Sequence, residues 1–131
     1  MSKLELQKTS AGYSVATVGN LSTFEGKEFV KDIMGTTSME VSFGSLAVGQ
    51  AVPFLHHHKQ NEELYVVLSG EGILLLDGQE IAVGSGCVAR VDPQVSRGMK
   101  NTGEAPMVYL CIQAKKGSLE QYAMSDGVVE E

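Results

Sequence analysis

The sequence predicts an all-β fold, an antiparallel sandwich or barrel built from short strands, and two observations carry this prediction. The first is composition: the 131 residues are 43% hydrophobic, with 15 glycines and no tryptophan. Small and β-branched side chains dominate the apolar set, which favours strands. The second is spacing, because from residue 39 to 113 short apolar segments alternate with Gly, Asp, Asn and Pro turns, as in a sandwich or barrel.

The strands are expected in a regular order. In the first, over 39–43, Met39, Val41 and Phe43 alternate with polar residues, which predicts a half-buried strand with the apolar set on its buried side. The others are expected over 64–68, 73–76, 80–83, 87–91, 97–101 and 107–113. Asp77-Gly78 lies between two of these segments and is a strong hairpin signal.

The two ends of the chain carry weaker patterns. Ser22 to Glu25 and Ser118 to Gln121 each fit a capping box, so short helical turns are expected near both termini. With no linker or low-complexity segment, residues 1–131 are expected to form one domain. A chain of this size buries roughly two-thirds of its unfolded surface, which is enough for a core of its own.

Charge and cysteine content restrict the partners and the location. The formal net charge is −6 and no Lys/Arg cluster interrupts it, so neither nucleic acid nor an acidic membrane surface is an expected partner. Cys87 and Cys111 are the only cysteines, and the N-terminus has no apolar secretion signal. The chain is therefore expected in the cytoplasm, with both thiols reduced and buried.

All three histidines lie in one run, His56-His57-His58. In an extended strand the side chains of His56 and His58 share a face and His57 points the other way. Glu62 or Glu63 is expected to return on the next strand and bring a carboxylate to the same wall. Two imidazoles and one carboxylate suit a divalent transition metal, and this set does not separate zinc, nickel, iron and manganese.

The spacing of these residues resembles the first motif of the cupin superfamily, G-x5-H-x-H-x3–4-E-x6-G. His56, His58, Glu63 and Gly70 fit it in register, and Gly49 precedes His56 by one residue too many. The resemblance selects Glu63 as the carboxylate ligand. It implies a jelly-roll barrel, also called a double-stranded β-helix, over about residues 39–113. It places the chain near small, uncharacterised bacterial cupin-2-type proteins.

The second cupin motif, G-x5-P-x-G-x2-H-x3-N, fits at its two ends and departs between them. Gly86 and Asn101 take the first and last positions, whereas Asp92 replaces the proline and Gln94 the inner glycine. Arg97 takes the place of the histidine that is the fourth metal ligand of the family. A guanidinium stays protonated and does not ligate a metal.

Arg97 leaves three interpretations open. In the first, His56, His58 and Glu63 hold a metal with open positions, and Arg97 grips the anionic end of a bound molecule. In the second, Arg97 pairs with Glu63, no metal binds, and the protein is a non-catalytic ligand-binding module. In the third, the pocket is vestigial and the histidines only satisfy hydrogen bonds inside the barrel.

Other side chains are expected around the ligand. Tyr65 shares the face of Glu63 in an ideal strand, and Met99 lies two residues beyond Arg97, so both should face the cavity. Gln60 is placed with the ligand-binding residues as a neutral oxygen donor, with a loop contact to backbone as the alternative.

These residues predict a cupin that binds one divalent metal and binds or acts on a small anionic metabolite. An isomerase, a decarboxylase and a dioxygenase all fit, and the choice between an enzyme and a binding module stays open. The family resemblance also implies a homodimer.

Overall fold

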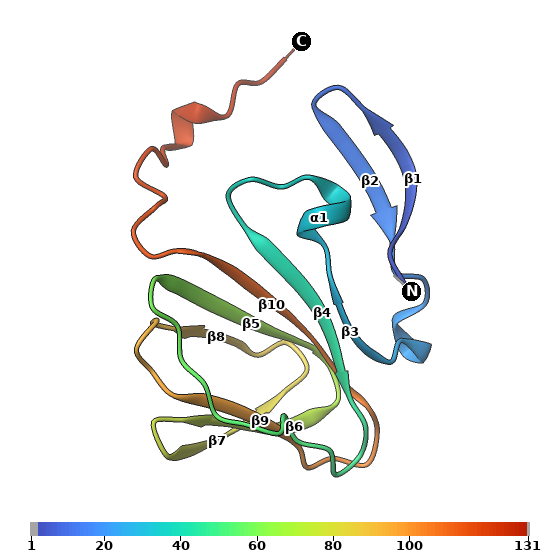
Figure 1. Cartoon of the computed structure of the whole chain (residues 1–131), viewed down its shortest axis with the longest axis vertical. Coiled ribbons are helices and arrows are strands. Elements are labelled where there is room, and N and C mark those ends of the chain that lie inside the picture. The colour runs from blue at the N-terminus through green and yellow to red at the C-terminus, as the bar shows by residue number, and fades with distance from the viewer. Residues whose placement is uncertain (1–2, 131) are drawn as a thin grey trace.

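Two antiparallel sheets form a barrel in the computed structural model, which describes residues 3–130 (Figure 1). The larger sheet has the order β3-β4-β10-β5-β8, and the smaller has the order β7-β6-β9. Their strands are β3 (Gly26–Phe29), β4 (Glu40–Leu46), β5 (Asn61–Ser69), β6 (Glu71–Leu76), β7 (Gln79–Gly84), β8 (Val88–Val91), β9 (Arg97–Asn101) and β10 (Met107–Lys115). The predicted all-β jelly roll is confirmed, and the seven strands expected from residue 39 onward all form.

Alternation and turn chemistry explain these strands. Along β5, Glu63, Tyr65 and Val67 are buried and their neighbours are half-buried, as expected of a strand with one face in a barrel. The β6–β7 hairpin turns at Asp77 and Gly78, where φ is 49° and 81°. Positive φ at both central residues is the geometry that Asp-Gly favours in a two-residue hairpin.

The N-terminal region contains elements that were not predicted. A hairpin of β1 (Glu5–Ser10) and β2 (Tyr13–Thr17) lies outside the barrel, beside the short helix α1 (Lys31–Met34) (Figure 1). The Ser14 hydroxyl donates to the Met34 carbonyl at 2.8 Å. Every side chain of β1 is exposed, so the sequence carries no burial pattern there.

Short helical turns do lie near the two ends, as predicted, but the first only overlaps the predicted capping box over 22–25, because it begins at Leu21 and its cap is Asn20 and not Ser22. The 3-10 turn η1 (Leu21–Thr23) is capped by Asn20, whose Oδ1 accepts from Ser22 N at 2.9 Å. The turn expected over 118–121 is wrong in position, because the helical turn there is η2 (Met124–Asp126). Ser118 N instead donates to the Lys115 carbonyl at 3.1 Å, which closes the turn that ends β10.

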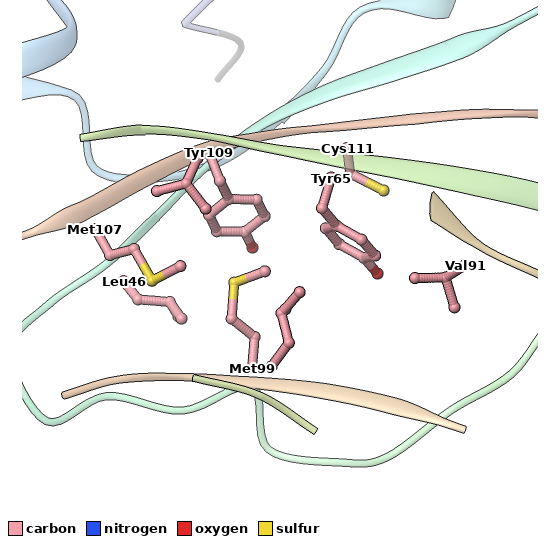
Figure 2. Close-up of a cluster of buried hydrophobic side chains, with 9 residues drawn as sticks. Leu46, Tyr65, Val91, Met99, Met107, Tyr109 and Cys111 are labelled. Atoms are coloured by element: carbon pink, nitrogen blue, oxygen red, sulfur yellow. The ribbon is translucent and has the colours of Figure 1, made fainter. Parts of the chain in front are cut away.

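The hydrophobic core lies between the two sheets (Figure 2). It consists of Leu46, Tyr65, Val67, Leu74, Val91, Met99, Met107, Tyr109 and Cys111. Cys111 is buried as predicted, and Cys87 is half-buried.

The predicted buried face of the first strand is wrong. Ser42, Gly44 and Leu46 face the interior, and Phe43 lies on the outer face, where its ring centroid is 6.2 Å from that of Phe24. The reason is volume: a Cβ on Gly44 would lie 2.6 Å from the Tyr109 hydroxyl oxygen. Small side chains on β4 therefore make room for an aromatic ring from β10.

Candidate metal centre

The histidine run lies in the segment between β4 and β5 and pairs with the start of β9. His56 and Arg97 form an isolated antiparallel bridge, with His56 N to Arg97 O at 3.1 Å and Arg97 N to His56 O at 2.9 Å. His58 N donates to the Pro93 carbonyl at 2.8 Å. The segment is extended enough for the predicted alternation, so His56 and His58 share a side and His57 is exposed.

The predicted ligand set comes together in space. One potential ligand atom from each of His56, His58 and Glu63 lies within 4.8 Å of the others. His58 Nε2 is 3.1 Å from Glu63 Oε2, and the two imidazole centroids are 5.2 Å apart. Ligand atoms about 2.1 Å from a shared metal lie roughly 3 to 3.5 Å from one another, so the His58–Glu63 separation already has the spacing of two ligands.

Two nitrogens of this cluster fit a metal because they lack another partner. Within residues 3–130, His56 Nδ1 and His58 Nε2 are buried and have no hydrogen-bond partner. His58 Nε2 lies 3.1 Å from Glu63 Oε2 without forming a hydrogen bond to it. A buried unsatisfied polar group costs about 1–3 kcal/mol, and a cation between these atoms would remove that cost.

The protonation of the cluster also suits a metal. Burial lowers the pKa of His56 below its usual value of 6.5, although the Glu63 carboxylate opposes the shift. His56 is therefore neutral at pH 7, the form that ligates a metal. For Glu63, burial raises the pKa, but hydrogen bonds from Tyr65, Arg97 and Cys111 outweigh it and hold the pKa below 4.5. The carboxylate is ionised.

The two oxygens of Glu63 have different neighbours. Oε1 accepts hydrogen bonds from Arg97 Nη1 at 2.7 Å and from the Tyr65 hydroxyl at 2.8 Å. Oε2 faces His58, and among residues 3–130 it accepts a hydrogen bond only from the weak donor Cys111 Sγ, at 3.3 Å. Oε2 is therefore the oxygen available to a metal, while Oε1 is held by the protein.

Arg97 is buried, with 1% of its surface exposed. Its Nη2 donates to the carbonyls of Asp92, Pro93 and Val95 at 2.7, 3.1 and 2.9 Å, and Nε donates to Val95 at 3.2 Å. The guanidinium thus ties the turn before β9 to Glu63. The pair expected in the second interpretation is present together with the ligand cluster of the first.

The other predicted ligand-contacting residues lie in two different environments. Tyr65 and Met99 are buried in the core (Figure 2), and the Tyr65 hydroxyl donates to Glu63 Oε1 at 2.8 Å. Burial raises the pKa of Tyr65 above its usual value, with the charge of Glu63 adding to the shift, so Tyr65 stays a donor. Gln60 is exposed, and its backbone carbonyl accepts a hydrogen bond from Lys116 N at 3.0 Å.

Cys111 and Phe54 belong to this region and were not predicted as part of the site. Burial and the nearby Glu63 carboxylate raise the pKa of Cys111 to about 12, so the thiol keeps the proton that it donates. Phe54 lies two residues before His56, and their ring centroids are 5.6 Å apart. Cys111 could have been found by strand alternation, because it pairs with Tyr65 on the neighbouring strand. The signal for Phe54 is its position two residues before His56.

A groove of about 1040 Å³ lies elsewhere, at the adjoining ends of β4, β5 and β10. Asn61 and Gln113, which are hydrogen-bonded at 2.8 Å, are among its lining residues. His56, His58 and Glu63 do not line it. The described residues also contain no helix long and apolar enough to cross a membrane.

The ligand cluster can hold a divalent transition metal through two nitrogens and one oxygen. Three protein ligands leave positions for water or for a bound molecule. Both histidines are half-buried, so a bound ion would lie at the barrel mouth.

Comparison with known proteins agrees with this fold. The Cupin domain model matches residues 42–113. The chain is 33% identical over 57 residues to an uncharacterised protein of Methanocaldococcus jannaschii, a match that covers 44% of this chain and 46% of that protein. It is 31% identical over 58 residues to the oxalate-binding protein of Thermotoga maritima, covering 44% and 48%. The chain thus spans about half the length of these curated relatives.

Solved structures extend the similarity to nearly the whole chain. A cupin protein from Bacteroides fragilis is 39% identical, with a TM-score of 0.84, and the match covers 92% of this chain and 98% of that one. A sugar phosphate isomerase of the cupin superfamily from Silicibacter pomeroyi has a TM-score of 0.62 at 20% identity, covering 72% and 68%, and shows the shared fold alone. The match over residues 42–113 covers more than half of the chain, includes strands of both sheets and contains His56, His58 and Glu63, so the chain belongs to the cupin family.

Proposed function

We propose that this cupin binds one divalent transition metal through His56, His58 and Glu63 and uses the site to bind or act on a small anionic metabolite. The observation that carries the proposal is the pair of buried, unpartnered imidazole nitrogens beside an ionised carboxylate. Zinc, nickel, iron and manganese all accept such a set.

Arg97 supports an anionic ligand without touching it. Its charge offsets that of Glu63 across the 2.7 Å ion pair, so the dication's charge would remain uncompensated by the protein. An anion would then be attracted to the open coordination positions. We place Arg97 and Tyr65 as positioning residues for Glu63, Met99 as packing behind Tyr65, and Gln60 as an exposed residue within reach of the ligand.

The reaction class follows from what the site can supply. A bound metal would act as a Lewis acid that polarises an oxygen of the bound molecule. Glu63 and the two histidines would hold the ion, and the core behind Tyr65 would exclude water from that side. An isomerase, a decarboxylase or a dioxygenase is compatible with this layout. The similarity to an oxalate-binding protein supports a small carboxylate as ligand.

A metal-free, non-catalytic binding module is the second candidate, and the Glu63–Arg97 ion pair favours it. In that case the pair alone would neutralise the buried carboxylate, and the histidines would donate to a ligand directly. The two candidates differ in metal content.

Elemental analysis of purified protein and zinc titration by calorimetry test the proposal. Wild type should bind one equivalent, and His56→Ala/His58→Ala should bind none. His57→Ala is the matched control, because this exposed neighbour lies outside the cluster and should leave binding unchanged. Equal metal content in wild type and the double variant would reject the metal site and leave the binding module.

We also propose that the protein is a cytoplasmic homodimer. The β1–β2 hairpin leaves Leu6, Tyr13 and Val15 about half exposed, and a lone two-stranded hairpin is marginal in water. A second copy packed against it would supply the missing contacts. Light scattering after size exclusion should give twice the mass of one chain.

The cytoplasmic location is proposed because both cysteines are free, which suits a reducing compartment.

A further inference from the structure

Three aromatic rings lie in a row at the barrel mouth: Phe54, His56 and His58. Their successive centroids are 5.6 and 5.2 Å apart, and each ring meets the next edge-on, at 64° and 77°. His56 and His58 lie on an extended segment, and the bend at Pro53 and Phe54 brings the Phe54 ring beside His56, so the three rings form a single wall. Two rings of this wall belong to the proposed metal site, and Phe54 continues it outward.

Phe54 is 60% exposed, although it stands directly beside a buried site. Its neighbour Leu55 is similarly exposed but packs over β9, since a Cβ on Gly98 would lie 2.7 Å from Leu55 Cδ2. Phe54 therefore contributes its ring to the side of the histidines, and Leu55 belongs to the opposite side. An aromatic face left in solvent next to a binding site is a surface on which a ligand can gain contact area.

The charges around the site assign the two ends of that ligand. Arg97 is bound to Glu63 and to backbone carbonyls and is 1% exposed, so recognition of the anionic end falls to the metal. The part of the ligand that extends past His56 then meets Phe54.

We propose that Phe54 is a specificity-determining residue of this site, and that the natural ligand is a small chelating anion carrying a planar or apolar group. The inference rests on the proposed function, because the metal holds the anionic end. The ring of Phe54 packs against the apolar end. Ligands that chelate equally well but lack this group bind more weakly.

Two hydroxamates separate these contributions, since acetohydroxamate and benzohydroxamate chelate through the same two oxygens and differ in a methyl against a phenyl group. Their dissociation constants are measured by calorimetry on zinc-loaded wild type, Phe54→Ala and Leu55→Ala. The preference is the dissociation constant of acetohydroxamate divided by that of benzohydroxamate. This ratio should be about tenfold larger in the wild type than in Phe54→Ala, a difference that one aromatic contact can supply. Acetohydroxamate should bind all three forms alike, and Leu55→Ala should keep the wild-type preference.

The outcomes distinguish the inference from the proposed function. An unchanged preference in Phe54→Ala, with both probes still bound, overturns the role of Phe54 and leaves the metal site standing. An equal loss of preference in Leu55→Ala overturns it as well, because the segment rather than the ring would then be responsible. If no form takes up zinc, the proposed function fails, and the inference fails with it.

Discussion

Arg97 and Glu63 form an ion pair almost wholly withdrawn from solvent, with Nη1 2.7 Å from Oε1 and 2% and 4% of the two side chains exposed. The arginine stands where the second cupin motif has a histidine ligand, and it binds the carboxylate ligand instead of the metal position. Because it uses only Oε1, Oε2 stays directed at His58. The pair is therefore compatible with the proposed metal site, in which Arg97 would orient the ligand oxygen of Glu63.

Replacing Arg97 by methionine should destabilise the fold by about 3–5 kcal/mol, since removing one partner leaves a buried charge uncompensated. Urea unfolding measures this loss. Arg90→Met is the matched control: Arg90 pairs with Asp92 but its side chain is 64% exposed, so its loss should cost less than about 1 kcal/mol. Similar losses in the two variants would contradict a structural role for the buried pair.

Replacing Tyr65 by phenylalanine removes the second donor to Glu63 Oε1 and keeps the ring in the core. Unfolding free energy should fall by about 1 kcal/mol. The pKa of Glu63 should rise, because the Tyr65 hydrogen bond is the largest of the effects that lower it. Zinc affinity below pH 6 should then fall more steeply than in wild type, as protons compete for the carboxylate.

Tyr109→Phe is the control for that experiment. Tyr109 is a buried tyrosine of the same core, with its ring centroid 6.4 Å from that of Tyr65. Its variant should keep the wild-type pH dependence of zinc binding. The same pH dependence in Tyr65→Phe and wild type would show that the hydroxyl does not position Glu63.

The strands of the barrel could be predicted because their residues alternate and their turns have distinctive chemistry. Asp77-Gly78 needs two positive φ angles and so marks a hairpin in the sequence itself. The N-terminal hairpin could not be predicted in the same way, since every side chain of β1 is exposed and no side chain of β2 is more than half-buried. The predicted buried face of β4 was wrong because the size of the Tyr109 side chain, on β10, decides which side chains of β4 fit inside the barrel.

The ligand set could be predicted from spacing, whereas the use of Arg97 could not. Alternation and the distance along the chain bring His56, His58 and Glu63 together in this barrel. The register of the second motif places Arg97 near these three residues, but it does not determine the direction of the arginine side chain. That direction depends on the carbonyls of Asp92, Pro93 and Val95, and backbone carbonyls leave no trace in residue type.

Packing around the glycines gives a matched test of the core. At Gly44 an added methyl would meet the buried Tyr109 ring, and at Gly98 it would meet Leu55, which is flexible and exposed. Gly44→Ala should therefore cost about 1–3 kcal/mol or more through overpacking, and Gly98→Ala clearly less. Urea unfolding of both variants measures the difference, and an equal cost would contradict the assigned interior face of β4.

The stability of the metal-free protein should fall as pH drops below about 6.5, and His56 is the reason. Burial lowers the pKa of His56 in the folded state, so the unfolded chain binds more protons in this range. Stability is then fully present above the unfolded pKa and is lost as the pH falls toward the folded pKa. A second loss should begin near pH 4.5, where the lowered pKa of Glu63 acts in the same direction.

Thermal unfolding in EDTA at constant ionic strength, between pH 7.5 and 5.5, tests the first of these losses. The wild-type melting temperature should decrease across this window, and His56→Gln should decrease less because glutamine does not titrate. His57→Gln, which changes the exposed neighbour, should follow the wild type. If His56→Gln loses as many degrees as wild type, proton uptake by His56 does not cause the loss, and the imidazole is not held neutral by burial.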